Sequence, residues 1–379
     1  MRGLKKAGIV SHFFAFLLFI FSLHLYAFDL GAAQIEEVEG QVLVIDQAGK
    51  SRAAIKGSDL LGEEMMETKA DSRAVILFED HSRLQIGPNT KVKLNDPMTE
   101  GNNSVMLFVG RIFARIVPRL SEDPIFSVQT LTCTAGVRGT DFEVASGMDG
   151  SELVSVEDGE VMVTSDTEEL QVKKGEEAEV SNEGKMKKGK RRLRTEQEWE
   201  DWLEQREKFF IEHSDQVINN LSRRVDNSRA RIKEQDEKLM ELKKELAAQA
   251  EAGKFFYFKA RNKVKQQIRP YTKTLNNLAQ ANNKLMAADQ ILARAEEQIQ
   301  LNPEAYSQEF QDQVSSAREK LNEMNLQGLY RENRKLLKWH FALLAKAAKK
   351  YHLEKELFRN LPAKTKQQIL KKYQEQRQD

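Results

Sequence analysis

Hydrophobic and polar positions follow two different rules along this chain. In residues 28–184, short apolar runs with internal alternation are separated by turn residues about every 8 to 12 positions, which is typical of half-buried β-strands. From Thr195 onward glycine is rare and apolar residues recur at three- and four-residue intervals, as on one face of a helix. The pattern therefore predicts an all-β region followed by an all-α region.

The β pattern predicts particular core positions. Its clearest stretch is residues 126–164, where alternation on both sides of a polar turn predicts paired strands with glycines at the corners. Cys133 lies in this pattern and is expected to be a small buried residue, since an unpaired cysteine packs like a small hydrophobe. Earlier strands are expected to turn the following residues inward: Val75, Leu77, Leu84, Ile86, Val92, Leu94, Ile112, Ala114 and Ile116.

The helical pattern opens with a helix-start signal. Thr195 and Glu198 have the spacing of a capping box, in which each side chain satisfies a backbone N–H group. Apolar residues seven apart then predict one long coiled-coil helix over residues 195–252, with Ser228 and Gln235 as polar seam positions. The seam residues are Ile211, Ile218, Val225, Ile232, Leu239 and Leu246, with Leu221 and Leu242 between them. We expect the helix to fray near residues 250–253.

Residues 253–379 predict a helical region with antiparallel helices. Pro270 is expected to kink or restart its helix. Asn302, Pro303 and Glu304 have the order of a helix start, with Asn as the cap and Pro at the first position. A connection this short makes the flanking helices antiparallel neighbours. The second of them is expected to bury Phe310, Val314, Ala317, Leu321 and Met324.

The predicted fold class is α+β in separate domains. Residues 28–184 form the all-β domain, residues 185–194 a basic linker, residues 195–252 the long helix and residues 253–379 the helical-hairpin region. Residues 1–27 read as a signal peptide, with a positive start, an apolar run at residues 13–21 and a small residue, Ala27, before the cleavage point. We expect cleavage after Ala27 and export to the periplasm or cell envelope; an uncleaved anchor is the alternative.

Charge is distributed unevenly along the chain. Residues 28–189 carry about 17 Lys and Arg against about 30 Asp and Glu, whereas residues 190–379 carry about 39 against about 28. Two solvated surfaces of different composition explain this, or else the halves dock on each other or the basic half faces an anionic surface. In an exported protein, phosphate-bearing envelope polymers are better partners for the basic residues than nucleic acid.

An aromatic and basic segment opens the last region. Aromatic side chains beside Lys and Arg suit a peripheral membrane or cell-wall contact with an anionic surface, or else they plug a junction between helices and leave the cations solvated. The residues of this segment are Phe255, Phe256, Tyr257, Phe258, Lys259, Arg261, Lys263 and Lys265.

No catalytic, metal or cofactor motif is recognisable. The histidines outside the signal segment are isolated, no phosphate-binding loop or G-x-S-x-G motif occurs, and Cys133 has no cysteine partner. Paired carboxylates for polymer hydrolysis would have to be held in a cleft, and Glu63-Glu64 and Glu176-Glu177 lie among turn residues instead. We therefore predict no enzyme activity and no cofactor.

The run T-A-G-V-R-G-T-D-F, followed by V-S-V-E-D-G-E-V-M-V, resembles the end of the FecR-type domain of bacterial proteins. The resemblance covers about residues 35–180, with His81 at a turn position that usually holds glycine. It marks the following motif residues as structural or as partner contacts: Val137, Arg138, Gly139, Thr140, Phe142 and Gly159. For Arg138 two roles are open, a ligand contact or hydrogen bonds to carbonyls that tie the corner.

Two functions follow from these features. The first is a non-enzymatic envelope protein whose FecR-type domain binds a protein or an envelope polymer, while the helices act as spacer or assembly element and can form a homo-oligomer through the coiled coil. The second is a membrane-anchored relay, since the family's namesake resembles a sensor that signals to a sigma factor. Only about a dozen residues precede the apolar run, too few for the cytoplasmic domain of that sensor.

Overall fold

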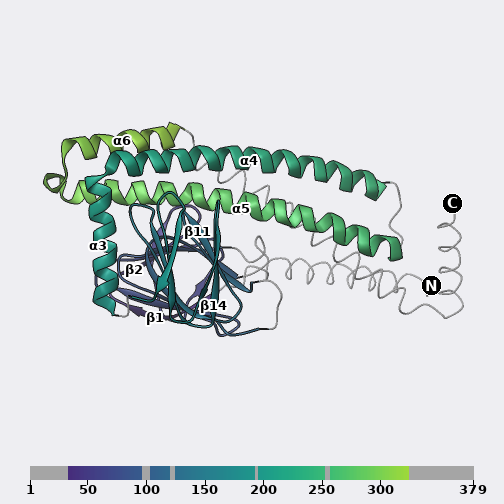
Figure 1. Cartoon of the computed structure of the whole chain (residues 1–379), viewed down its shortest axis with the longest axis horizontal. Coiled ribbons are helices and arrows are strands. Elements are labelled where there is room, and N and C mark those ends of the chain that lie inside the picture. Colours follow the sequence, from purple (N-terminus) through teal and green to yellow (C-terminus); the bar gives the residue numbers. More distant parts are fainter. Residues whose placement is uncertain (1–32, 96–102, 120–123, 193–194, 252–256, 324–379) are drawn as a thin grey trace, which may run out of the picture. The chain divides into compact units, whose positions relative to one another are not determined.

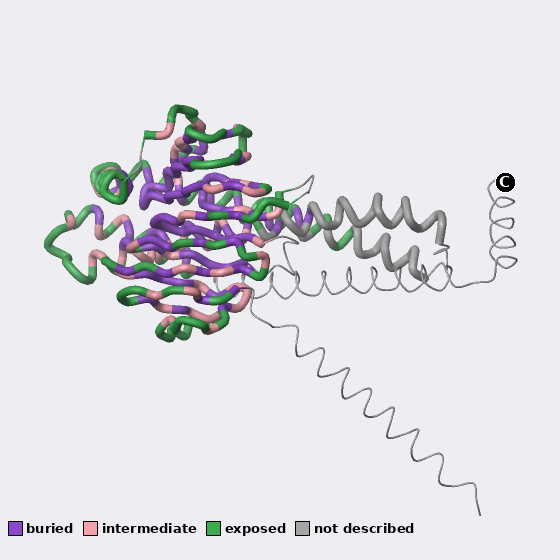
Figure 2. The backbone as a smooth tube through the Cα atoms, turned by 90° about the horizontal axis from the view of Figure 1, so that it is seen from below, coloured by how far each residue is buried: buried purple, intermediate pink, exposed green. Residues whose placement is uncertain are grey.

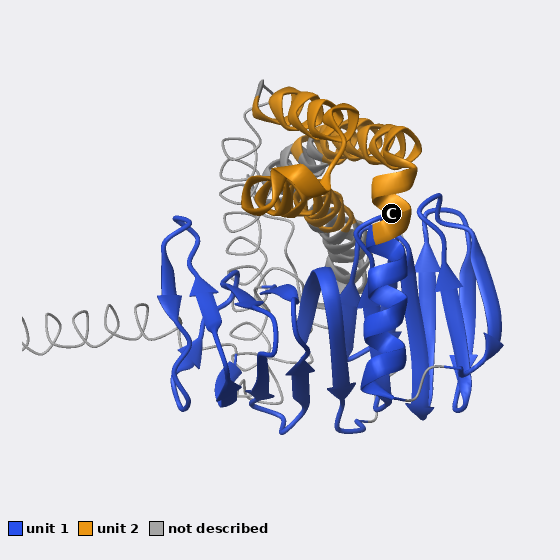
Figure 3. Cartoon of the chain, turned by 90° about the vertical axis from the view of Figure 1, so that its left-hand side faces the viewer, with its two compact units in different colours: residues 1–97, 102–207 blue, residues 98–101, 208–379 orange. Residues whose placement is uncertain are grey.

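The computed structural model describes residues 33–95, 103–119, 124–192, 195–251 and 257–323 (Figure 1). The chain divides into two compact units, residues 1–97 with 102–207 and residues 98–101 with 208–379 (Figure 3). The first unit holds the predicted β region and the residues that follow it up to Glu207, and the second unit is helical, so the predicted fold class is confirmed. The predicted signal segment and residues 324–379, with Met324 and Trp339, lie outside the described residues.

The strands of the described residues form a 17-stranded hydrogen-bonded network. Their bounds are β1 (Ala33–Glu39), β2 (Val42–Ile45), β3 (Ser51–Ala53), β4 (Asp59–Leu60), β5 (Met65–Thr68), β6 (Arg73–Phe78), β7 (Arg83–Ile86), β8 (Lys91–Leu94), β9 (Asn103–Arg115), β10 (Phe126–Gln129), β11 (Cys133–Val137), β12 (Asp141–Ser146), β13 (Glu152–Asp158), β14 (Glu160–Ser165), β15 (Glu169–Lys173), β16 (Glu176–Val180) and β17 (Met186–Lys190).

These strands make two sheets that share β9. Sheet A has the order β4–β1–β6–β7–β9–β12–β13–β16–β17. Sheet B has the order β3–β2–β5–β8–β9–β10–β11–β14–β15, in which only the β9–β10 pair is parallel. Strand β9 changes sheets at Gly110, whose φ is 98° and where a Cβ would lie 2.5 Å from the Cα of Thr90. A side chain does not fit this bend, so glycine is required.

One hydrophobic core takes alternate residues from the strands of both sheets (Figure 2). Ile112 and Ala114 of β9 belong to it, as does Cys133 at the start of β11. The predicted core positions Leu84, Ile86, Val92, Leu94 and Ile116 are confirmed as well.

The predicted inward positions of β6 are wrong by one residue. Ala74, Ile76 and Phe78 point into the core, whereas Val75 and Leu77 are only half-buried. The sequence from Ala74 to Phe78 is apolar at every position, so alternation cannot indicate which face is buried. The pairing of β6 with β1 and β7 selects the face.

Residues 186–190, expected to be part of a basic linker, form the edge strand β17 instead. The acidic strand β16 pairs with it, and its charges explain why a lysine-rich segment becomes a strand. Lys188 Nζ lies 2.8 Å from a Glu176 carboxylate oxygen, and Arg192, just after β17, pairs with Glu177 and Glu179. Opposite charges on neighbouring strands stabilise the pairing.

The Asp80–Ser82 turn keeps a backbone that normally favours glycine. His81 has a φ of 66°, in the left-handed region, and the Asp80 carboxylate accepts a hydrogen bond from Ser82 N at 3.0 Å. The substitution of His for the usual glycine therefore leaves the turn conformation left-handed, with a small conformational cost.

The helices within the described residues are α3 (Glu196–Glu212), α4 (Ser214–Glu251), α5 (Tyr257–Leu301) and α6 (Gln308–Glu323), with a short 3-10 turn, η2 (Pro303–Ala305). In the helical unit, α4 packs along α5, and α6 packs on both. Buried residues on α6 are Phe310, Val314, Ala317 and Leu321, as expected. None of the described helices combines the length and the hydropathy that a membrane crossing requires.

Three helix predictions need correction. The long helix over residues 195–252 is two helices, α3 and α4, separated at His213. α5 continues through Pro270 without a restart. Asn302 makes no side-chain cap and leads only into η2, whereas Ser307 Oγ accepts a hydrogen bond from Phe310 N at 3.2 Å and so caps α6. Near the break at His213 the buried positions shift by one, from Ile211 and Ile218 to Phe210 and Val217.

The seam of α4 is buried within the chain. Val225 and Ile232 are buried where α4 packs along α5, and the predicted polar positions Ser228 and Gln235 are buried among them. The side chains of Leu239, Leu242 and Leu246 lie outside the described set. Assembly of several copies through this seam stays a prediction.

Candidate functional site

The outer face of sheet A holds the first part of α3, and we call this surface the docking face. Trp199 and Trp202 of α3 form a buried cluster with Ala145 of β12 and Leu153 of β13, and Leu203 packs against it. Trp199 is 1 % exposed and Trp202 7 %. A small residue just after β12 lets α3 approach closely: a Cβ on Gly147 would lie 2.7 Å from the Cβ of Arg206. Such a cluster is a strong anchor, because aromatic side chains bury large apolar areas.

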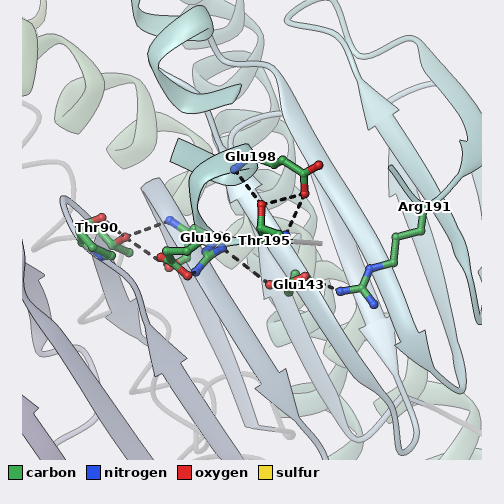
Figure 4. A network of polar contacts seen from close by, with 8 residues as sticks. Thr90, Glu143, Arg191, Thr195, Glu196 and Glu198 are labelled. Carbon is green, nitrogen blue, oxygen red and sulfur yellow. Dashed lines mark hydrogen bonds and ion pairs between the residues drawn. The ribbon is translucent and has the colours of Figure 1, made fainter. Parts of the chain in front are cut away.

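The N-terminus of α3 is capped as predicted. Glu198 N donates to the Thr195 hydroxyl at 3.3 Å, and the Glu198 carboxylate accepts from Thr195 N at 2.9 Å (Figure 4). The capping box is confirmed, and it begins the helix directly beside the docking face.

An ionic network joins the start of α3 to sheet A (Figure 4). Arg111 of β9 pairs with Glu196 of α3, approaches Glu143 of β12 to 3.8 Å, and lies over the Trp199 ring at 5.6 Å from its centroid. On the other side of Glu143, Arg191 Nη2 donates to its carboxylate at 2.9 Å. Two guanidinium groups therefore share one largely buried carboxylate, and one of them also pairs with the helix.

The backbone of β9 positions Arg111. Its N–H donates to the Thr90 hydroxyl at 2.9 Å, and that hydroxyl donates back to the Arg111 carbonyl at 3.2 Å. Thr90 also approaches Gly110 at the bend of β9, so the bend between the two sheets sets the direction of the Arg111 side chain. Burial raises the pKa of Glu143, while the positive charges of Arg111 and Arg191 oppose this rise.

A second contact ties α3 to the turn between β12 and β13. Arg206 lies over the Trp202 ring at 5.7 Å from its centroid, and its Nη1 is 3.8 Å from a carboxylate oxygen of the buried Asp149. Asp149 also accepts hydrogen bonds from the backbone N of Ser151 at 3.0 Å and from its hydroxyl at 2.9 Å. The helix is thus held at Trp199 and Trp202, with an arginine beside each ring.

These groups hold the first part of α3 on the sheet. The charged side chains of the docking face serve ion pairs, helix capping and cation–π contacts. In the described part of the chain no cluster of His, Cys, Asp and Glu has the size of a metal site.

The loss of Arg111 tests the network. Arg111→Met should lower the free energy of unfolding by about 2 to 3 kcal/mol, because it leaves Glu196 without this partner and Glu143 with only Arg191. Chemical denaturation of Arg111→Met, Glu143→Gln and the double variant measures the coupling. Additive costs in this cycle would contradict a shared network.

The family-motif residues gather at a different place, the corner between β11 and β12. Val137 and Phe142 are buried in the core, and the Thr140 hydroxyl donates to the Glu160 carbonyl at 2.9 Å. Gly139 has a φ of 140° and lies against Pro118, while a Cβ on Gly159 would come within 2.9 Å of the Gly139 carbonyl oxygen. The two motif glycines therefore allow two chain segments to touch backbone to backbone.

Two surface contacts were predicted, one at Arg138 and one at the aromatic and basic segment that opens α5. Arg138 is half-exposed and lies 3.9 Å from a Glu160 carboxylate oxygen across the same corner. Tyr257 and Phe258 begin α5, and Lys259, Arg261, Lys263 and Lys265 follow on this helix; their side chains, with Phe255 and Phe256, lie outside the described set. Both roles stay predictions, a partner contact at Arg138 and an anionic-surface contact at the start of α5.

Sequence reasoning missed the docking face. Trp199 and Trp202 stand three residues apart directly after the capping box, and they are two of the three tryptophans in the chain. That spacing puts both indoles on one face of a helix. The sheet residues Arg111 and Glu143 had no comparable signal, since only the strand pairing places them side by side.

The architecture defines this chain as a two-sheet β protein with a helix anchored on one face. Residues 64–162 match the family model described as "FecR protein", so the chain carries a FecR-type domain. The matched residues extend from the segment before β5 to β14, within the larger β unit.

Comparison with solved structures gives partial likenesses. Two crystal structures, at 1.65 and 2.50 Å, of "a putative anti-sigma factor from Parabacteroides distasonis ATCC 8503" align with a TM-score of 0.30 and 20% identity. The alignment covers 33% of this chain and 59% of that chain. A "Cell surface anchoring domain" aligns with a TM-score of 0.16 and 24% identity, over 17% of this chain and 83% of that one. No curated protein matches the chain significantly.

Proposed function

We propose that this chain is a non-enzymatic protein exported to the periplasm or cell envelope. Its FecR-type domain binds a protein partner or an envelope polymer, and its helical region serves as a spacer or assembly element. The observation that carries this proposal is the anchoring of α3 on the docking face through Trp199, Trp202 and the Arg111 network.

This anchoring supports a mechanical role. A helix with two buried indoles and paired arginines moves with its sheet, so the first part of α3 is a fixed element of the β unit. Since α3 covers Ala145 and Leu153, a partner of the FecR-type domain has to use other surfaces of the sheets. The motif corner around Gly139 and Arg138 is one such surface.

Fractionation tests the location. The full chain, expressed in a bacterium with an envelope, is expected in the envelope fraction, shortened by its signal segment and released by an alkaline carbonate wash. Mass spectrometry of the mature N-terminus checks cleavage after Ala27. Recovery of the uncleaved chain in the cytoplasm would contradict the proposal.

Binding is tested separately. Purified mature chain is expected to co-sediment with isolated envelope polymer, or to give one dominant crosslinked protein in intact cells. Arg138→Ala is the variant expected to weaken this contact if the motif corner binds the partner, and Lys50→Ala, in the turn after β2, is the control. Absence of any envelope contact in both assays would contradict the binding role.

A membrane-anchored relay is the second candidate, and the same helix supports it. A helix fixed to the sensing domain transmits a change in that domain along the chain more directly than a linker does. In this case the apolar run at residues 13–21 stays uncleaved as an anchor. Retention of the chain in the membrane after the alkaline wash favours the relay, and release favours the soluble envelope protein.

A further inference from the structure

Glu152 is a carboxylic acid inside the core of the β unit. It is the first residue of β13 and pairs with Ser146 at the end of β12. Its side chain is 0 % exposed and shares the inward face of β13 with Val154 and Val156, which belong to the core. Burying an ionised carboxylate at such a place is costly unless it is paired.

The surroundings of Glu152 do not pair it. Within the described residues, neither carboxylate oxygen has a hydrogen-bond partner, nor does the hydroxyl of the buried Thr132. Burial raises the pKa of Glu152 well above its usual 4.5, and the nearby Asp149 raises it further. The hydroxyls of Ser146, Thr130 and Thr132 lie near enough to favour the charged form, with a smaller effect than burial. The Ser146 and Thr130 hydroxyls donate instead to the carbonyls of Phe108 and Cys133, so they do not satisfy the carboxylate. A protonated carboxyl has an O–H donor that the carboxylate lacks, so the neutral form suits this place.

The turn that precedes Glu152 is the turn that holds α3. Gly147 N donates to the Ser151 carbonyl oxygen at 2.8 Å and closes it. Gly147 lies against Arg206, and Asp149 in the same turn pairs with Arg206 at 3.8 Å. Residues 147–151 therefore adjoin Glu152 on the core side and contact Arg206 on the docking face.

We propose that Glu152 is a proton-controlled latch for α3. In its neutral form the turn closes over the core and keeps Asp149 and Gly147 against Arg206. When Glu152 ionises, the carboxylate seeks water, the turn opens, and the end of α3 around Trp202 and Arg206 leaves the docking face. The use of this latch for signalling rests on the proposed function, but the latch itself is a property of the isolated chain.

The groups that face Glu152 determine whether the closed turn gains or loses stability as the pH rises. Asp149 is the other acid of the turn, and burial raises its pKa as well; Arg206 of α3 opposes this. The segment between β10 and β11 contributes the hydroxyls of Thr130 and Thr132, and the paired strand β12 contributes that of Ser146. Because the pKa of Glu152 is raised in the folded chain, the closed turn is fully stable below pH 4.5 and loses stability as the pH rises through the higher folded value.

Tryptophan emission follows the latch. In a Trp339→Phe background only Trp199 and Trp202 emit, and both are on α3. We expect the emission to shift to longer wavelength as the pH rises from 4.5 to about 9, because the indoles then reach water. The upper limit is chosen because the pKa values of buried glutamates reach about 9. Glu152→Gln, which cannot ionise, should keep the short-wavelength emission throughout. Glu169→Gln, an exposed acid on β15, should titrate like the parent.

Two results would overturn the latch. One is a parent emission that stays constant over this range; the other is the same titration in Glu152→Gln as in the parent. Arg206→Gln gives an independent reading, because it should emit at longer wavelength even at pH 4.5, with circular dichroism showing intact strands. Normal short-wavelength emission in Arg206→Gln would also contradict the latch. None of these results bears on envelope location or partner binding, which are measured separately.

Discussion

Gly139→Ala is expected to lower the unfolding free energy of the β domain by about 4 kcal/mol. The φ of Gly139 is 140°, and a Cβ there would lie 2.5 Å from the Cα of Pro118. Because that Cα is a backbone atom, no side-chain rotation relieves the contact, and strain and overlap add. Urea denaturation of the purified protein, followed by circular dichroism, measures the loss.

Gly175→Ala is the matched control. Gly175 also has a positive φ, 78°, but nothing lies within 4 Å of the position of an added Cβ. Only the conformational cost remains, about 1 kcal/mol. Equal losses at the two glycines would show that the close approach at the motif corner does not exist.

Trp199→Ala is expected to remove about 3 to 5 kcal/mol from the docking of α3. The indole is 1 % exposed, packs with Ala145 and Leu153, and lies beneath the Arg111 guanidinium. Its removal leaves a cavity on the sheet that the small neighbours cannot fill. Limited proteolysis should then cut α3 in the variant at protease concentrations that leave the parent intact.

Glu200→Ala is the control on the same helix. Glu200 is exposed on α3, next to Trp199 in the chain, and we expect a change within about 0.5 kcal/mol. If Glu200→Ala sensitises α3 as strongly as Trp199→Ala, the helix is held by something other than its buried face.

The sequence alone was sufficient where local chemistry determines the structure. The capping box at Thr195 and Glu198 forms as the spacing predicts, because both partners lie within one turn. Alternation in β7 and β8 predicted Leu84, Ile86, Val92 and Leu94 correctly, since polar residues separate them. The polar seam positions Ser228 and Gln235 were also located by the heptad repeat.

Sequence reasoning failed where distant segments decide. Val75 and Leu77 lie in an uninterrupted apolar run, and only the pairing with β1 and β7 turns them outward. Residues 186–190 look like a linker until the acidic strand β16 supplies opposite charges. The break at His213 interrupts an otherwise regular heptad pattern that contains no proline or glycine there.

The docking face shows the same division. Its helix side was visible as two tryptophans three residues apart, but its sheet side depends on β9 changing sheets at Gly110. That bend brings Arg111 beside Glu143, which lies 32 positions later in the sequence. Neither residue has a sequence neighbour that marks it as part of a helix-binding surface.

Amide hydrogen exchange across α3 measures whether this helix is anchored on sheet A. In the intact protein, the amides from Trp199 to Arg206 should exchange as slowly as those of β12, because the helix opens only when its indoles leave the sheet. If these amides exchange as fast as those of an undocked helix while β12 stays protected, α3 is not anchored and the account is wrong.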